Sequence, residues 1–338
     1  MIWGALLIGV ILITLLQLFV PERALDTLEA DRLPEALLGE AAEPVTVQFR
    51  VSNRSFRLFP FVAVDIKIPF AREEAIGYSF WLGPKQTLTR NFPVTIDRRG
   101  RYVLEDMKLR CGDFLGLREY TKTCGSYREI VIPPQAMDSV RLDKLMGGFL
   151  GDVSVNRFIL EDPVLTLGYR EYTGGDPMKR ISWAQSARCN RLMVKKNDYT
   201  VEPSVSVLLN VDTDLRNDRE ICEVCFRLAR SVCAALEKKG MRYSFSANAH
   251  LAGYSRNADG IAGMGQRHFR GILETLGRSL PESDVSLQVL LEQELQRPES
   301  CGRILITPGG SEADSAYVAR LREFGPLVVI KGTEAALW

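Results

Sequence analysis

The sequence has few of the residues with which enzymes usually do their chemistry. Its only histidines are His250 and His268, and neither lies beside a cysteine or carboxylate pattern typical of a metal site or a catalytic triad. There is no Gly-x-Ser-x-Gly, His-Glu-x-x-His or Walker motif. Gly147, Gly148 and Gly151 lack the lysine and the spacing of a phosphate-binding loop. We therefore expect no catalytic residues and no enzymatic activity.

A large net charge is also missing. The chain has 43 Lys and Arg and 42 Asp and Glu, which leaves a net charge of +1. Proteins that bind nucleic acid through overall basicity carry a clear excess of positive charge, so we expect no nucleic-acid partner. The 338 residues, 46% of them hydrophobic, are typical of a globular protein with two or three domains.

The seven cysteines show no spacing of a disulfide scaffold. Their odd number and irregular spacing fit a reducing compartment. Cys222 and Cys225 lie on a predicted helix without a second Cys or His pair nearby, which favours core packing over a metal or redox site. The seven are Cys111, Cys124, Cys189, Cys222, Cys225, Cys233 and Cys301.

The first 20 residues, Met1–Val20, contain no charged side chain. About 20 apolar helical residues span the hydrocarbon core of a bilayer, so we predict a transmembrane anchor over residues 1–22. A cleaved signal peptide would need a basic start and a small-x-small cleavage site, which are absent. A buried helix of a globular domain is the third possibility. Arg23 and Arg32 follow the segment, which favours a single-pass protein with its soluble domains in the cytoplasm.

Residues 38–135 contain short alternating segments separated by Gly, Pro, Asn and Asp. Val45–Val51 alternates strictly between apolar and polar residues. About seven short strands in such a length predict an immunoglobulin-like β-sandwich, a fold that mostly binds proteins or acts as a spacer. Arg98–Arg101 is expected to form a hairpin turn. The predicted strands are 45–51, 61–68, 78–82, 88–96, 101–104, 107–111 and 129–132.

From residue 201 to 338, apolar strand-like runs alternate with amphipathic helices. This order predicts a doubly wound parallel sheet, whose ligands bind at the carboxyl ends of the strands. The predicted strands are 205–211, 242–247, 303–307 and 327–331, and the predicted helices are 217–239, 268–280, 286–296 and 312–323.

A connector, residues 136–200, contains the least generic stretch of the chain, Gly168–Lys196. Asp176-Pro177 is typical of a helix start, since aspartate caps free amides and proline suits the first helical position. Ile181, Ala184 and Ala187 continue at helical spacing, and a strand is expected at 192–194. Six basic residues and no acid lie between residues 176 and 198, at Lys179, Arg180, Arg188, Arg191, Lys195 and Lys196.

These features predict an exposed recognition element, and each has an alternative. Asp176 can be a helix cap only, and the basic residues can be a solvated helix face. Trp183 fits a core position, the commoner one for tryptophan, as well as a binding anchor.

The order of residues in this stretch resembles the signature of the bacterial "domain of unknown function 58" family. Shorter resemblances occur at Arg98–Tyr102 and Asp113–Leu117. Members typically have a membrane-anchored N-terminus, a β-rich segment, the signature and a domain like von Willebrand factor type A. The resemblance thus implies an α+β multidomain protein with a transmembrane helix, a β-sandwich and a doubly wound, von Willebrand A-like α/β domain. It implies partner-binding residues at Arg170, Tyr172, Gly175, Asp176, Arg180, Trp183 and Arg188.

A von Willebrand A domain holds a divalent cation with Asp-x-Ser-x-Ser after its first strand, because a hard cation prefers oxygen ligands. Here the resemblance places Asp212 at the first position, Asp214 at the first serine and Arg216 at the second. The aspartate that usually ends a later strand is missing from Leu305–Gly310. The site is therefore degraded. Weak Mg²⁺ binding, a fixed charge from Arg216, and simple capping of the next helix all remain open, and no other cofactor is expected.

The resemblance implies partnership with a MoxR-type AAA+ ATPase in assembling or remodelling other complexes. We therefore expect a non-enzymatic, membrane-anchored scaffold. An extracytoplasmic protein that binds ligands or matrix is the alternative. A hydrolase that uses Asp176, Asp212 and Asp214 is a third hypothesis.

Overall fold

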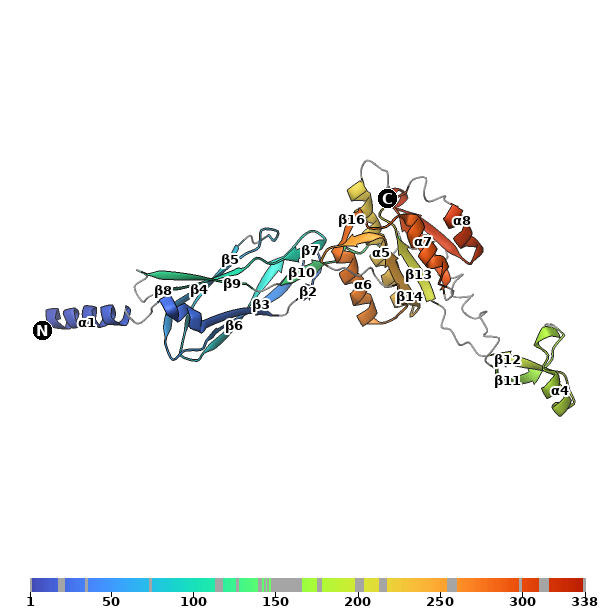
Figure 1. Cartoon of the computed structure of the whole chain (residues 1–338), viewed down its shortest axis with the longest axis horizontal. Helices are drawn as coiled ribbons and strands as arrows, with labels where there is room; N and C mark the ends of the chain where they lie inside the picture. Colours follow the sequence, from blue (N-terminus) through green and yellow to red (C-terminus); the bar gives the residue numbers. More distant parts are fainter. Residues whose placement is uncertain are drawn as a thin grey trace. The chain divides into compact units, whose positions relative to one another are not determined.

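The structure, a computed structural model, divides the chain into two compact units, Met1–Gln135 and Ala136–Trp338 (Figure 1). The described residues are 2–17, 22–33, 36–72, 75–112, 118–125, 128–138, 142, 144, 146, 166–174, 178–197, 204–212, 218–253, 260–297, 300–309 and 316–336.

The chain begins with helix α1, Ile2–Gln17, which has no charged residue. Its large apolar side chains are exposed, whereas a helix on the surface of a globular domain buries one apolar face. They are Trp3, Leu6, Leu7, Ile8, Val10, Ile11 and Leu12. In the part of the chain that the structure describes, no helix has the length and apolarity that a membrane crossing requires. The anchor over residues 1–22 stays a prediction.

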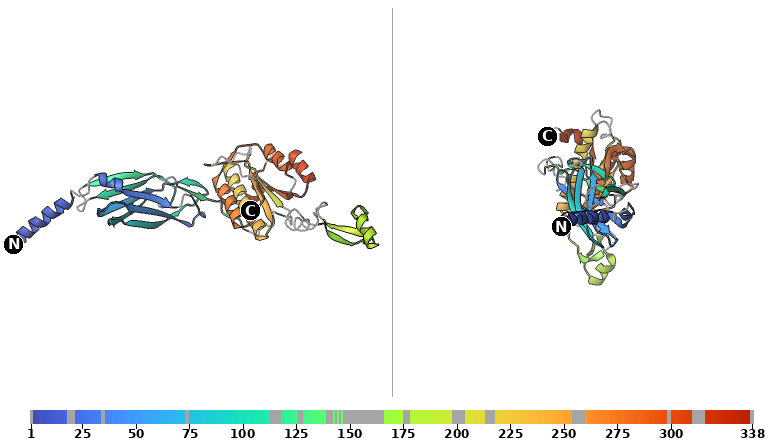
Figure 2. Two further views of the ribbon diagram at one scale, coloured as in Figure 1. Left: turned by 60° about the horizontal axis from the view of Figure 1, so that its bottom comes forward. Right: turned by 90° about the vertical axis from the view of Figure 1, so that its left-hand side faces the viewer.

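The rest of the first unit consists of antiparallel sheets and one short parallel pairing (Figures 1 and 2). One sheet has the order β1-β3-β6 and another the order β5-β4-β8-β9, while a small sheet has the order β2-β10-β7. A 3₁₀ helix, η1 (Glu22–Thr27), precedes the strands β1 (Leu28–Leu33), β2 (Ala36–Leu38), β3 (Pro44–Asn53), β4 (Phe59–Lys67), β5 (Ala75–Leu82), β6 (Thr87–Thr95), β7 (Gly100–Val103), β8 (Met107–Gly112), β9 (Glu119–Cys124) and β10 (Glu129–Ile132).

The two larger sheets share one hydrophobic core, which makes the unit a β-sandwich. Alternate residues of β3 are buried, and Phe49 contacts Phe92 of its own sheet and Tyr78 of the other at ring-centroid distances of 6.1 and 5.7 Å. The alternation seen in the sequence therefore set the inward face of each strand.

In the first unit, three strands, β1, β2 and β9, were not expected. β1 is an edge strand with three charged residues, and β9 carries two, so neither has the apolar pattern that identifies a strand. The expectation for Arg98–Arg101 was wrong. β6 and β7 belong to different sheets, so this segment links two sheets and does not close a hairpin.

The α/β part of the second unit has a parallel sheet with the order β14-β13-β17-β18 and helices on both faces (Figure 1). β13 (Ser204–Leu209) is buried throughout. Its Val205 and Val207 pack in one core and Leu208 in another. The remaining elements are α5 (Asp218–Lys238), β14 (Arg242–Ala247), β15 (Ala249–Leu251), α6 (Gln266–Arg278), β16 (Ser279–Ser283), α7 (Leu287–Leu295), β17 (Ser300–Thr307), α8 (Ala316–Glu323), β18 (Leu327–Lys331) and α9 (Gly332–Ala336).

Cys222 and Cys225 are fully buried on α5, as the core-packing interpretation predicted. Burial raises the pKa of the Cys225 thiol, which therefore stays protonated. In the sandwich, burial likewise raises the pKa of Cys111 to about 11. Six cysteines form no disulfide: Cys111, Cys124, Cys189, Cys222, Cys225 and Cys233.

One ion pair is enclosed by the α/β part. Arg303 on β17 donates through Nε to Oε1 of Glu294 on α7 at 3.2 Å, and the two side chains are 4% and 1% exposed. Removing one partner would leave the other charge in a region that water does not reach.

We predict that Arg303→Met lowers the free energy of unfolding by about 3 kcal/mol, because the buried Glu294 carboxylate loses its nearer cation while its pair with Arg297 is longer, at 3.8 Å. The double variant Glu294→Leu/Arg303→Met should recover most of that loss. Arg72→Ala, which removes the exposed pair with Asp97, is the control and should change stability far less. Chemical denaturation followed by circular dichroism measures all three. Equal losses in the single and double variants would contradict the prediction.

Candidate functional site

The central motif forms a small module, residues 166–197, which we call the central hairpin. Strands β11 (Thr166–Glu171) and β12 (Met193–Asn197) pair antiparallel, with Arg170 opposite Val194 and Glu171 opposite Met193. The 3₁₀ helix η2 (Met178–Arg180) and helix α4 (Trp183–Cys189) lie between them in the chain (Figure 1).

Two buried serines join helix and strands in the central hairpin. Ser186 Oγ donates to Ser182 O at 2.8 Å and accepts from Met193 N at 2.9 Å. Ser182 N donates to Met193 O at 2.8 Å. Asn190, in the left-handed conformation with φ of 51°, ends α4 so that the chain can return into β12. The module thus has a defined shape that hydrogen bonds hold.

Few of the apolar side chains that the structure describes in the central hairpin are buried. Ile181 and Val194 are buried, and their backbones form an isolated β-bridge with each other. The large side chains of Tyr169, Met178, Trp183 and Leu192 are exposed instead, and Trp183 is 66% exposed. The core position considered for Trp183 was therefore wrong.

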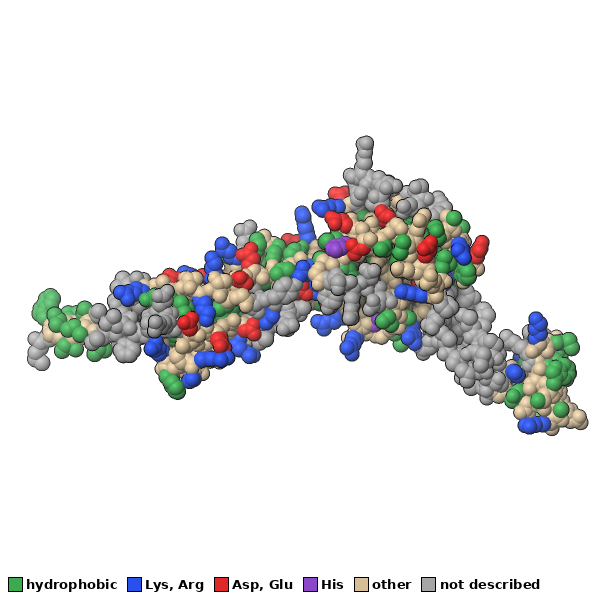
Figure 3. Space-filling view, viewed as in Figure 1, with side chains coloured by type: hydrophobic (Ala, Val, Ile, Leu, Met, Phe, Trp, Pro, Cys, Tyr) green, Lys and Arg blue, Asp and Glu red, His purple; other side chains and the backbone are tan. Residues whose placement is uncertain are grey.

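Positive charge surrounds these apolar side chains. Residues 166–197 contain seven basic and two acidic residues, a net charge of +5. Arg170 and Arg188 are exposed, and Arg191 pairs with Glu171 at 2.5 Å. On the face seen in Figure 3, hydrophobic and basic side chains of the hairpin lie next to one another. This combination is typical of a surface that binds an acidic protein.

Asp176 and Pro177, the expected helix start, lie outside the described residues. The 3₁₀ helix η2 follows at Met178–Arg180, but the helical spacing expected from Ile181 onward is interrupted, because Ile181 pairs with Val194 and α4 begins separately at Trp183 after Ser182. The hydrogen bonds of Ser182 and Ser186 to Met193 fix the start of α4. Met193 lies in β12, so residues next to the helix start do not reveal this boundary.

The structure brings part of the expected partner-binding set together. Arg170, Trp183 and Arg188 are exposed and Tyr172 is half-buried. Gly175 and Asp176 lie outside the described residues, as does the side chain of Arg180. Sequence reasoning missed Tyr169, Met178 and Leu192. The one available signal was the presence of large apolar residues in a segment otherwise rich in charge.

The carboxyl edge of the parallel sheet holds a network of buried amides. Asn210 follows β13 and Asn248 follows β14, and both are buried. Asn248 Nδ2 donates to Asn210 Oδ1 at 2.7 Å, and Asn210 Nδ2 donates to Thr307 Oγ1 of β17 at 3.0 Å. Asn210 also bonds to the backbone N and O of Asp212. Asn248 accepts from Val211 N and donates to Val285 O. The network joins the ends of β13, β14 and β17, and the two amides bond to other groups of the protein.

The degraded cation site lies beside this network. Asp212 is half-buried, and its backbone, not its carboxylate, bonds to Asn210. Asp214 and Arg216 are outside the described residues. Within the described ranges, no three His, Cys, Asp or Glu side chains are grouped so that they could hold a metal ion.

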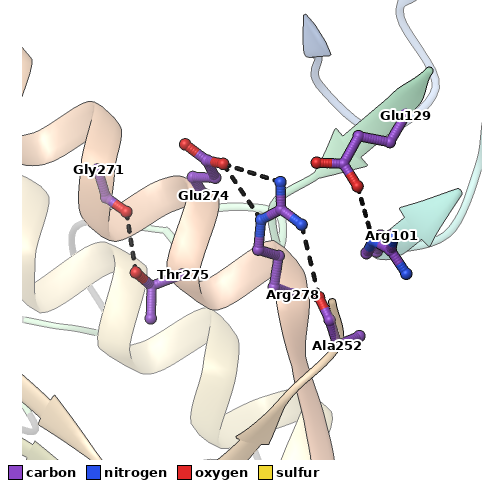
Figure 4. Close-up of polar contacts among 7 residues, drawn as sticks. All are labelled: Arg101, Glu129, Ala252, Gly271, Glu274, Thr275 and Arg278. Atoms are coloured by element: carbon purple, nitrogen blue, oxygen red, sulfur yellow. Dashed lines mark hydrogen bonds and ion pairs between the residues drawn. The ribbon is translucent and has the colours of Figure 1, made fainter. Parts of the chain in front are cut away.

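The two histidines and the buried Arg278 have structural partners. His250 contacts Asp284 at 2.7 Å, and His268 contacts the backbone oxygen of Tyr243 at 3.0 Å. Figure 4 shows Arg278 bonded to Glu274 and to Ala252 O, where it links α6 to the end of β15.

The same view shows Arg101 of β7 paired with Glu129 of β10 at 2.7 Å. Thr275, also drawn there, bonds back to Gly271 O within α6. These contacts stabilise local structure and do not form a reactive group.

Residues 168–301 match the family model described as "Protein of unknown function DUF58". The match supports the family expected from the central motif. It includes most of the central hairpin and the α/β part as far as the start of β17. A search of curated proteins finds no match to the chain.

Three solved structures that resemble the chain each match about a third of its length. The CARDB domain of the PF1109 protein from Pyrococcus furiosus, in complex with di-metal ions, is 17% identical with a TM-score of 0.22, and the match covers 31% of this chain and 90% of that one. Alkylpurine DNA glycosylase AlkC from Pseudomonas fluorescens is 12% identical with a TM-score of 0.20, and the match covers 31% of this chain and 30% of that one. AvmM, which catalyses macrocyclization in alchivemycin A biosynthesis, is 9% identical with a TM-score of 0.22, and the match covers 33% of this chain and 93% of that one. Scores this low carry no argument about function.

We predict that Ser186→Ala opens the central hairpin while leaving the α/β part folded. The change removes the hydroxyl that joins Ser182 O to Met193 N and costs about 1–3 kcal/mol, because buried backbone groups lose their partner. Hydrogen exchange at the Met193 amide should become faster. Trp183→Ala is the control and should leave that exchange rate unchanged, because the indole is exposed. Unchanged exchange in Ser186→Ala would show that the serine does not hold the module.

Proposed function

We propose that this protein is a non-enzymatic, membrane-anchored scaffold whose central hairpin binds a protein partner. The observation that carries the proposal is the exposure of Trp183 on a module in which few of the described apolar side chains are buried. Tryptophan is enriched among the residues that contribute most to binding energy, because it buries a large apolar surface with few rotatable bonds.

The size of the module supports this proposal. A two-stranded hairpin alone in water is at best marginally stable, and among the side chains whose burial the structure describes, Ile181 and Val194 are the buried apolar ones in this hairpin. Docking against another protein would remove Tyr169, Met178, Trp183 and Leu192 from water. The serine bonds hold α4 in place before the partner arrives, which lowers the entropic cost of binding.

Charge defines the kind of partner. The net +5 of residues 166–197 favours an acidic surface, which would speed association and fix orientation more than it raises affinity. The resemblance stated above makes a MoxR-type AAA+ ATPase the partner to test first. We further propose that the β-sandwich is immunoglobulin-like and acts as a spacer, and that the α/β part is a von Willebrand A-like domain.

In this proposal the amide network at the sheet edge holds the strand ends together, as a bound cation would. Asn210, Asn248 and Thr307 join the strand ends through hydrogen bonds, as a metal would through ligands. Asp212 remains a candidate for a weak Mg²⁺ contact with a partner's carboxylate.

The test is affinity purification of the full-length protein from its own membranes after mild detergent extraction. Trp183→Ala/Arg188→Ala should lose an AAA+ ATPase that the unmodified protein retains, by at least tenfold, because truncating a central anchor of an interface typically costs about 2 kcal/mol or more.

Trp81→Ala is the matched control, since Trp81 has nearly the same exposure, 65%, but lies on the sandwich. It should retain the ATPase. Equal recovery of the ATPase with all three proteins would remove the hairpin from the interface, and recovery of no ATPase with any of them would reject this partner.

Labelling of Cys189 tests the proposed cytoplasmic position of the soluble domains, because this cysteine at the end of α4 is exposed. We expect a membrane-impermeant maleimide to leave Cys189 unlabelled in intact cells and to label it after permeabilisation. Cys189→Ser identifies the signal. Labelling in intact cells would place the soluble domains outside the cytoplasm and favour a ligand- or matrix-binding protein.

A further inference from the structure

One end of the β-sandwich presents large apolar side chains to solvent. We call it the aromatic end and define it as residues 53–58 and 81–86. Phe56 is 83% exposed and Trp81 is 65% exposed, with Leu58 also exposed between them in the sequence. Phe61, on the neighbouring strand β4, is exposed as well. Residues of this kind usually lie in a core unless they contact something else.

The loops of the aromatic end are held in place by one buried side chain. Asn53 Nδ2 donates to Arg57 O and to Gly83 O, both at 2.7 Å. Its Oδ1 accepts from the backbone and the hydroxyl of Ser55. Lys85 N donates to Ser55 O at 2.9 Å, which ties the second loop to the first. Phe56 is therefore exposed on a well-ordered loop.

Basic side chains accompany these apolar ones. Arg57 and Lys85 are exposed, and the Lys85 ammonium lies 4.7 Å from the centre of the Phe56 ring. Arg54 is exposed too and pairs with Glu29 at 2.6 Å. Aromatic rings beside Lys and Arg are typical of proteins at the surface of a bilayer, where rings enter the headgroup layer and cations meet anionic lipids.

The aromatic end is also where the chain enters the sandwich. Arg54 N donates to Thr27 O at 2.9 Å, and Leu28, the first residue of β1, pairs with Asn53. Four residues lie between Gln17 of α1 and Glu22 of η1, and the five Cα–Cα steps across them reach at most about 18 Å. The opposite end of the sandwich lies a further strand away, about 33 Å for the ten residues of β3.

We propose that the aromatic end rests on the membrane surface, with Phe56 and Trp81 in the headgroup layer and Arg57 and Lys85 on anionic lipid. The inference rests on the proposed membrane anchor. It adds the orientation of the sandwich, which the anchor alone does not determine: the aromatic end contacts the bilayer. A protein partner at this surface is the competing assignment, which the test separates.

The test uses the full chain with Trp81 as its only tryptophan, obtained by Trp3→Phe, Trp183→Phe and Trp338→Phe. The protein is reconstituted into vesicles of phosphatidylcholine and phosphatidylglycerol, with and without bromine on the acyl chains near the headgroup. Brominated lipid should quench Trp81 fluorescence. Arg57→Glu/Lys85→Glu should reduce the quenching, because it removes attraction to the anionic lipid.

The control moves the tryptophan along the same strand. Ala75 lies on the same outward face of β5, six residues and about 20 Å from Trp81, and is also exposed. Ala75→Trp with Trp81→Phe should show no quenching. Flotation of the vesicles reports the anchor in every sample.

Protein that fails to float would overturn both the anchor and this inference. Floating protein with unquenched Trp81 would overturn the inference alone and leave the anchor intact. Quenching at both positions would also overturn it, because the sandwich would then lie along the bilayer.

Discussion

The α/β part depends on the two-sided burial of β13. All six residues of this strand are buried, and alternate side chains enter different cores. A strand covered on both faces requires helices on both sides, and parallel neighbours follow because each crossover contains a helix. The same arrangement brings the ends of β13, β14 and β17 to one edge, where Asn210, Asn248 and Thr307 bond to one another.

The central hairpin has the opposite balance of interactions. Its shape depends on the hydroxyl of Ser186 and not on a hydrophobic core, and its largest apolar side chains face water. The sandwich shows a similar division, since Asn53 holds Phe56 outward in a fixed loop. In both modules polar contacts give the shape and exposed apolar residues are left for binding. On this basis we propose a protein partner for the hairpin and a lipid surface for the sandwich.

The periodicity of the sequence was sufficient for most elements. Val45–Val51 became the interior of β3, and the helix expected over 217–239 is α5 at Asp218–Lys238, followed by Gly240 with a φ of 63°. Glycine with positive φ ends helices, so that boundary was visible locally. The parallel sheet with helices on both faces followed from the order of the elements.

The sequence by itself determined which faces of strands and helices are apolar, because that depends only on spacing along the chain. The tertiary structure alone decided that Trp183 is exposed, that Ile181 pairs with Val194 so that α4 starts at Trp183, and that β9 joins a sheet. Each of these depends on a residue distant in the sequence: Met193 bonds to Ser182 and Ser186, and Tyr120 pairs with Cys111 of β8. Whether a residue is buried, and which strand it pairs with, depends on contacts between residues far apart in the sequence. The order of residues alone does not predict these contacts.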